Sequence, residues 1–264
     1  MSMRKAFSTI MGMAMLSMLV LPTSAQLADQ AARERASNAV RSQLHLKPDQ
    51  FLGVQRDGKL EQLLTVVAGR PGDLEFIYQV SQAGDEVKEN AVVHHIFTDA
   101  DPTYIVAVSP ADGDMYRIHG FADSMAEFGR LMTATKVKVL SADQAEAVSD
   151  FYREVNPQHT SMTPITSLIE LKQAAERQCQ TSSFDMGERE FDAWWKHGKP
   201  LYAGVPFRQT ATAIGTRFIV EWTVLSSSAP GNCGGSPLRA RLEVDSDGHV
   251  GKLTFAPLSG GGLG

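Results

Sequence analysis

The chain has 264 residues, of which 43% are hydrophobic and 21% are charged. This composition supports a globular core and excludes a disordered or fibrous protein. The formal net charge of −5 argues against non-specific binding of nucleic acid, which depends on a basic face. We therefore expect no nucleic-acid partner, and the length fits one large domain or two small ones.

The N-terminal segment is typical of a secretory signal peptide. Two basic residues precede a nearly continuous apolar run over residues 6–21, and small residues follow Pro22. The run of roughly 16 apolar residues is shorter than the roughly 20 that a membrane-spanning helix needs. The pattern predicts a signal peptide over residues 1–25, no membrane span after its cleavage, and a soluble exported protein that is periplasmic or secreted.

Residues 26–46 are alanine-rich, have apolar side chains on one side, and predict a helix that ends before Pro48. Runs rich in β-branched and aromatic residues follow, and they predict strands over 60–68, 74–80, 91–98, 104–108 and 115–118. Asp112-Gly113 predicts a hairpin turn between the last two strands.

Helical spacing returns after residue 120. An apolar pattern at i, i+4, i+7 and i+11 predicts one helix, with the residues Phe121, Met125, Phe128 and Met132 on its face. Residues 136–140 alternate like a short strand. Ser141, with Gln144 three positions later, predicts a capped helix that ends at Asn156.

A polar stretch over 157–163 marks a candidate domain boundary. Thr163-Pro164 predicts the start of a helix, and a second helix is expected over 188–197. The remaining runs are extended, over 201–211, 216–225, 238–244 and 250–256, and a turn at 245–248 joins the last two into a hairpin.

This order of elements predicts an α+β fold, with helices packed on antiparallel sheets in two halves that each read as helix and then meander. We expect an N-terminal domain over 26–156 and a C-terminal domain over 157–258. A flexible Gly-rich tail is expected over 259–264.

The chain has two cysteines, Cys179 and Cys233. An even count in an oxidising compartment favours a disulfide between them, across 54 positions of sequence. Closing a loop of that length stabilises a fold by roughly 4 kcal/mol in the chain-entropy treatment. Two free thiols are the alternative.

Familiar cofactor and metal motifs are missing from the sequence. It has no Gly-x-x-x-x-Gly-Lys loop, no Gly-x-Gly-x-x-Gly after a strand and no Gly-x-Ser-x-Gly elbow. His94 and His95 are neighbours in a predicted strand, so their side chains point to opposite faces and cannot share one metal. The acidic turn after residue 243 lacks the closing glutamate of a calcium loop, because Thr254 stands there. We expect no cofactor and no metal.

Trp194 and Trp195 form an aromatic face with Phe191 on a short predicted helix. If this face is exposed, it is a possible binding platform for sugars or peptides. If it is buried, it covers the C-terminal sheet, and a helix this short needs such packing to persist.

The most specific local pattern is Pro230-Gly231-Asn232-Cys233-Gly234-Gly235, followed by Gly248-His249-Val250-Gly251. It resembles the nucleophile region of viral chymotrypsin-like cysteine proteases, in which glycines let backbone amides form an oxyanion hole. The resemblance implies that Cys233 is the nucleophile and that His249 lines the specificity pocket, and His119 is the nearest upstream candidate for the base. The similarity covers 22 residues, and the helices predicted over 120–197 depart from the double β-barrel of that family.

Two functions from different classes follow from these observations. The first is an exported binding or accessory module for a small molecule, a peptide or a protein. The alternative is a hydrolase, most concretely a cysteine protease that uses Cys233. Titration of free thiols separates them, because a sulfur in a disulfide cannot attack a substrate.

Overall fold

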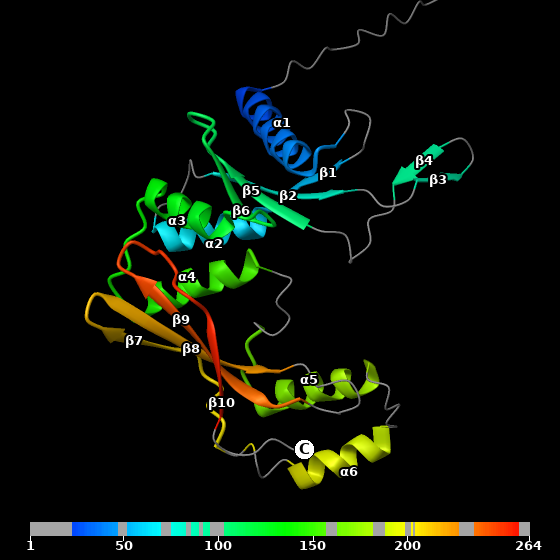
Figure 1. Ribbon diagram of the computed structural model, residues 1–264, viewed down its shortest axis with the longest axis vertical. Helices are drawn as coiled ribbons and strands as arrows, with labels where there is room; N and C mark the ends of the chain where they lie inside the picture. Colours follow the sequence, from blue (N-terminus) through cyan, green and yellow to red (C-terminus); the bar gives the residue numbers. More distant parts are fainter. Residues whose placement is uncertain are drawn as a thin grey trace, which may run out of the picture.

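The fold was analysed in a computed structural model that describes residues 23–46, 52–69, 75–82, 86–89, 92–95, 103–156, 163–181, 188–198, 202, 204–226 and 235–258. These residues form two four-stranded antiparallel sheets, a separate two-stranded hairpin and the helices that pack on the sheets (Figure 1). The predicted α+β fold class is confirmed.

The first sheet has the strand order β1-β2-β5-β6. Its strands are β1 (Leu52–Arg56), β2 (Phe76–Gln82), β5 (Thr103–Val108) and β6 (Met115–His119). The hairpin of β3 (Glu86–Glu89) and β4 (Val92–His95) lies between β2 and β5 in sequence but belongs to neither large sheet. The first half is therefore not a simple meander, because a helix separates β1 from β2 and a hairpin separates β2 from β5.

The second sheet is a continuous meander with the strand order β10-β9-β8-β7. Its strands are β7 (Thr210–Ile214), β8 (Arg217–Leu225), β9 (Pro237–Asp245) and β10 (Thr254–Pro257). The predicted turn at 245–248 joins β9 to β10, and the N–H of Gly248 donates to the carbonyl of Asp245 at 3.1 Å.

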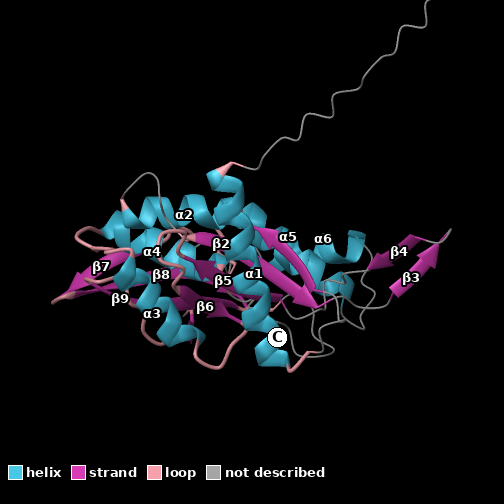
Figure 2. Ribbon diagram, turned by 90° about the horizontal axis from the view of Figure 1, so that it is seen from above, coloured by secondary structure: helices cyan, strands magenta, loops and turns pink. Residues whose placement is uncertain are grey.

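The helices form layers around these sheets, as Figures 1 and 2 show. Helix α1 (Ser24–Leu44) covers one face of the first sheet. Three helices lie between the two sheets: α2 (Gly58–Ala68), α3 (Ser124–Ala134) and α4 (Ala142–Glu154). Helices α5 (Leu168–Thr181) and α6 (Glu188–Gly198) pack together with the end of β8.

Alternation along the central strand β5 separates two parts of the core. Tyr104, Val106 and Val108 face α1, whereas Ile105 and Ala107 face the middle helices, and all five are buried. This is the period of two that a strand imposes on its side chains. The first sheet therefore buries both faces.

The main core joins the two halves of the chain. It contains Phe128 of α3 and Phe151 of α4, and it also contains Trp222 of β8 and Leu242 of β9. The ranges 26–156 and 157–258 stay a prediction as domains, and they share this core.

Four predicted elements were wrong, one of them the extended run over 201–211, where strand structure begins only at Thr210. Residues 60–68 form the helix α2, because Asp57 caps it by accepting from the N–H groups of Lys59 and Leu60. Residues 136–140 form no strand, although Val137 and Val139 are buried. Helix α5 begins at Leu168, several residues after the expected start.

The N-terminal turn of α1 overlaps the predicted cleavage site. The side chain of Thr23 accepts from the N–H of Gln26 at 3.3 Å, and the Gln26 side chain accepts from the N–H of Thr23 at 2.8 Å. Cleavage after Ala25 would remove this capping box, which closes the helix in the uncleaved chain. Residues 1–22 lie outside the described residues, and export stays a prediction. Among the described helices, none combines the length and apolarity needed to cross a membrane.

Candidate functional site

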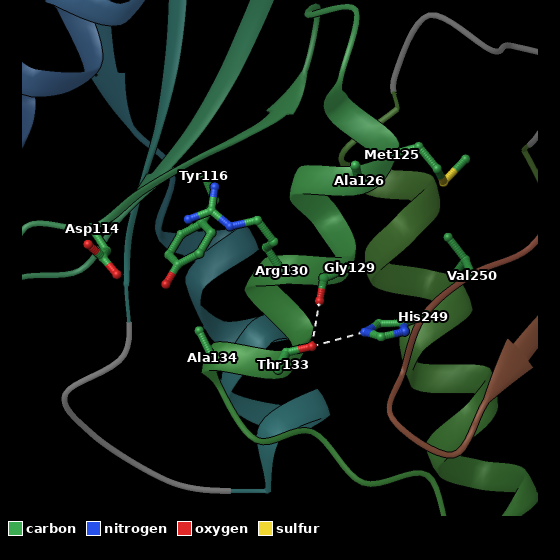
Figure 3. A pocket seen from close by; sticks show the side chains of 10 residues that line it. All are labelled: Asp114, Tyr116, Met125, Ala126, Gly129, Arg130, Thr133, Ala134, His249 and Val250. Atoms are coloured by element: carbon green, nitrogen blue, oxygen red, sulfur yellow. Dashed lines mark hydrogen bonds between the residues drawn. The ribbon is translucent and has the colours of Figure 1, made fainter.

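A cleft of about 590 Å³ lies between α3, β6 and the turn that follows β9 (Figure 3). Helix α3 provides one wall, with the residues Met125, Ala126, Gly129, Arg130, Thr133 and Ala134. The loop before β6 and the start of β6 provide Asp114 and Tyr116, and the turn after β9 provides His249 and Val250. The cleft thus combines side chains from both halves of the chain.

Two glycines set the position of two ionisable residues in this cleft. Gly113 (φ +77°) directly precedes Asp114, and Gly248 (φ +78°) directly precedes His249. Only glycine adopts this left-handed conformation without steric cost. Both turns were predicted from their Asp and Gly residues, and the structure places them at the two ends of one cleft (Figure 3).

A third glycine lets the imidazole of His249 lie directly against α3. A Cβ added to Gly129 would be 3.3 Å from Cδ2 of His249, which is closer than most such contacts. Glycine inside a helix costs roughly 1 kcal/mol relative to alanine. At Gly129 the missing side chain leaves room for the His249 ring, which comes from a distant part of the chain.

His249 is held by groups on both sides of its ring. Its Nδ1 lies 3.4 Å from Oδ2 of Asp245, and its Nε2 lies 3.0 Å from Oγ1 of Thr133. The Thr133 hydroxyl donates to the carbonyl of Gly129 at 3.0 Å, so its oxygen is placed to accept from Nε2–H. In the protonated ring both nitrogens donate, one toward Asp245 and the other toward Thr133.

Arg130 is fixed beside Tyr116. Its Nη1 donates to Oε1 of Glu127 at 2.7 Å, and its guanidinium carbon lies 5.3 Å from the centre of the Tyr116 ring. Glu127 is buried and also accepts from the N–H of Arg117 at 3.4 Å. The hydrogen bond to Glu127 raises the pKa of Arg130, so the guanidinium stays charged.

Asp114 carries negative charge at the other end of the cleft. Its N–H donates to Oδ1 of Asp112 at 3.0 Å, and this bond lowers the pKa of the Asp112 carboxyl. Among the described residues, no ion pair engages the Asp114 carboxylate. Figure 3 shows Asp114 and His249 on opposite sides, with Tyr116 and Arg130 between them.

The structure does not bring the two predicted histidines, His119 and His249, into one site. His119 is buried at the end of β6, where its Nδ1 is 3.3 Å from Oδ1 of Asn156, whereas His249 faces Thr133 in the cleft. Cys233 lies outside the described residues. The cysteine-protease arrangement therefore stays a prediction.

Cys179 is buried on α5, in a cluster with residues of α6 and the end of β8. Because Cys233 is not described, the disulfide also stays a prediction. In the part of the chain that the structure describes, no three His, Cys, Asp or Glu side chains gather as metal ligands. His94 and His95 lie on β4, as expected from the strand pattern.

Trp194 and Trp195 pack within the α5–α6 cluster. Trp195 is 7% exposed, and its ring stacks on that of Tyr202 with centroids 5.4 Å apart. Trp194 is half-buried, with its ring 5.4 Å from that of Phe191. Trp195 therefore presents little surface to a ligand, and Trp194 presents more.

Arg130, Thr133 and Tyr116 were not predicted as site residues. One usable signal was Gly129, because a glycine inside an amphipathic helix indicates a bend or a close approach of another segment. Comparisons of the chain with protein-family models, with curated proteins and with solved structures found no match, so the cleft itself has to carry any functional argument.

Proposed function

We propose that this protein is an exported binding module and that its ligand occupies the cleft between α3, β6 and the turn after β9. One observation carries the proposal: three separate segments each place an ionisable side chain on the same cleft, namely Asp114, Arg130 and His249. Ligand sites typically combine an apolar lining with a few such convergent polar groups in a volume of about 300–1,000 Å³.

The polar side chains of the cleft are held in fixed orientations by their neighbours, and this supports a binding function. Arg130 is oriented by Glu127, and His249 by Asp245 and Thr133. Groups that are already oriented lose little side-chain entropy when a ligand arrives, and this reduces the cost of association.

A thermal-shift screen tests the proposal with amino acids, short peptides, sugars and nucleotides as probes. The variant Ala126→Trp fills the cleft, because Ala126 is an exposed residue of its α3 wall. The matched control is Val66→Trp on α2, where the side chain is also exposed but lies outside the cleft. We expect at least one class of probe to raise the Tm of the wild type and of Val66→Trp, and not that of Ala126→Trp. The proposal fails if no probe raises the Tm or if the shift persists in Ala126→Trp.

The alternative function, a hydrolase that uses Cys233, depends on the sequence resemblance. His119 would have to act as its base and His249 would have to line the specificity pocket. His119 is buried with its Nδ1 3.3 Å from Oδ1 of Asn156, and the ring nitrogens of His249 face Asp245 and Thr133. Alkylation of native protein tests this alternative, because a nucleophilic Cys233 must be a free thiol.

A further inference from the structure

We infer that this protein forms a symmetric dimer in which the edge strand β7 pairs antiparallel with β7 of a second copy of the chain. This inference is independent of the cleft and of its ligand. It is carried by three features of β7, namely its exposure, its lack of charge and the direction of its backbone groups.

Strand β7 is the outermost strand of the second sheet, and it lies at the rim of the molecule in Figures 1 and 2. Four of its five residues are exposed, and Ile214 is 57% exposed. Its sequence, Thr-Ala-Thr-Ala-Ile, contains no charged residue and no proline. Proteins usually protect an edge strand with charge, proline, a bulge or a covering segment, because its backbone groups pair readily with another strand.

The hairpin register identifies the backbone groups of β7 that point outward. A loop of two residues joins β7 to β8, with Ile214 opposite Arg217, and Gly215 (φ +62°) fits the first position of such a loop. This hairpin closes on a hydrogen-bonded pair, and hydrogen-bonded and non-hydrogen-bonded pairs then alternate along the ladder. The N–H and C=O groups of Ala211 and Ala213 therefore point to the free edge.

The edges of the first sheet are covered by side chains. At the β6 edge, the N–H of Arg117 donates to Oε2 of the buried Glu127 at 3.4 Å. At the β1 edge, the carbonyl of Val54 accepts from Nη1 of Arg33 at 3.4 Å. In the part of the chain that the structure describes, no side chain makes such a bond to the outward groups of β7. A partner strand can therefore bond to them.

Strand β7 is complementary to itself. With a two-fold axis at Thr212, Ala211 of each copy lies opposite Ala213 of the other, and the two pairs form N–H···O=C bonds. Thr210 then lies beside the exposed Ile214 of the other copy. Because β7 is uncharged, this pairing places no like charges opposite each other, although each chain has a net charge of −5. The two second sheets would join into one continuous sheet.

The pairing would end at a dimer. Strand β10 at the other edge of the second sheet contains Pro257, which has no N–H to donate to a further strand. A contact between two short strands is small, so the dimer should be weak, with a Kd between about 10 μM and about 1 mM.

Sedimentation velocity of the full chain, over a series from about 10 μM to about 1 mM, measures this Kd. Thr212→Lys places two like charges opposite each other at the two-fold axis and should raise the Kd by at least about tenfold. Thr212→Glu should do the same, whereas an equimolar mixture of the two variants should dimerise, because opposite charges then face each other. The matched control is Thr254→Lys, an exposed threonine of β10 on the same face of the sheet.

We expect the wild type and Thr254→Lys to dimerise with the same Kd. A wild type that stays monomeric at about 1 mM overturns the proposal and leaves the edge to a partner other than a second copy. A dimer that Thr212→Lys leaves intact, a mixture of Thr212→Lys and Thr212→Glu that stays monomeric, or growth beyond the dimer also overturns it. A circular-dichroism melt of each variant identifies any loss of dimer that unfolding causes.

Discussion

At the scale of single residues, the two positive-φ glycines of the cleft differ in what surrounds them. A Cβ on Gly248 would lie 2.7 Å from Cγ1 of Val137, which is buried at 2% exposure. A Cβ on Gly113 would lie 1.5 Å from Nη1 of Arg35, the end of an exposed and flexible side chain. A buried valine cannot move aside as an exposed arginine can.

We therefore predict that Gly248→Ala destabilises the fold more than Gly113→Ala does. Gly248→Ala combines the left-handed backbone penalty of roughly 1 kcal/mol with overpacking of roughly 1–3 kcal/mol. Gly113→Ala should cost about the backbone penalty alone. The control is Gly58→Ala at the start of α2, where a Cβ meets no atom within 4 Å. Urea denaturation measures the three changes, and equal stability of Gly248→Ala and Gly58→Ala would contradict the prediction.

A second residue-scale prediction concerns Tyr78, which is fully buried between α1 and the first sheet. Its hydroxyl donates to Oδ1 of Asp29 at 2.8 Å, and burial raises its pKa well above the ordinary value. The neutral phenol therefore stabilises the fold fully below the unfolded-state pKa of about 10, and this contribution is lost as the pH rises toward the folded-state pKa.

The free energy of unfolding should accordingly fall between about pH 9 and about pH 11 in the wild type, and fall less in Tyr78→Phe. At neutral pH the variant should be less stable by about 1–2 kcal/mol, because the Asp29 carboxylate loses a hydrogen bond. Other buried tyrosines, including Tyr152 and Tyr202, also have raised pKa values and remain in the variant, so the difference reports on Tyr78. An identical pH profile for both proteins would refute it.

At the scale of elements, capping residues and apolar periodicity predict some helices correctly, whereas β-branched residues lead to a wrong prediction at α2. The large and small apolar residues on one side of α4 are buried, namely Ala145, Val148, Phe151 and Tyr152, and Ser141 accepts from the N–H of Gln144 at 3.3 Å. The spacing of Leu60, Leu64 and Val67 was also helical, but their β-branched neighbours favoured a strand. Capping and periodicity were predictable because they involve residues close in sequence.

The face of α3 shows where sequence periodicity is insufficient. Phe128 and Met132 are buried as predicted, whereas Met125 is 48% exposed and lies at the cleft. Phe121 precedes the helix and packs on the opposite side of the first sheet, against Tyr104. Two of the cleft residues, His249 and Val250, come from a segment more than one hundred positions after α3, and one sequence cannot reveal that this segment packs there.

The element-scale prediction concerns α6. Trp195 contacts an aromatic cluster with Phe191 and Tyr202, and Trp194 is at its edge. Trp195→Ala should cost about 3–5 kcal/mol, as for a large aromatic residue in a core. Trp194→Ala should cost clearly less, because its side chain is half-buried. Chemical denaturation followed by circular dichroism measures both, and an unchanged stability of Trp195→Ala would instead support an exposed binding platform.

At the scale of the whole molecule, the middle helices connect the two sheets. Helices α2 and α4 are joined by the ion pair between Lys59 and Glu154 at 2.7 Å, and α4 buries Phe151 in the same core as Trp222 of β8. Arg153 of α4 also lies 4.7 Å from the centre of the Trp222 ring. The cleft lies across this connection, with α3 on one side and the turn after β9 on the other. A ligand in the cleft would therefore stabilise the contact between the two halves.

A disulfide between Cys179 and Cys233 would link α5 to the segment between β8 and β9. The described residues on either side of that segment support this pairing. Gln178, the neighbour of Cys179, donates from Nε2 to the carbonyl of Ser226 at 2.9 Å. Gly235 lies two positions after Cys233, and a Cβ there would be 2.6 Å from Oε1 of Gln178. Both flanks of the segment that carries Cys233 thus adjoin the turn of α5 that carries Cys179.

Peptide mapping of non-reduced, exported protein should yield a cross-linked peptide that contains Cys179 and Cys233. Reduction, or the double variant Cys179→Ala with Cys233→Ala, should lower the free energy of unfolding by about 4 kcal/mol, since the bridge closes a loop of more than fifty residues. The single variant Cys233→Ala also removes the bridge but keeps the buried sulfur of Cys179. It therefore controls for the cavity that loss of this sulfur creates in the double variant. Two thiols that alkylate in the native protein would contradict the bridge and would favour cysteine chemistry at Cys233. A bridge removes that nucleophile, so the same map decides between the binding module and the cysteine-dependent hydrolase.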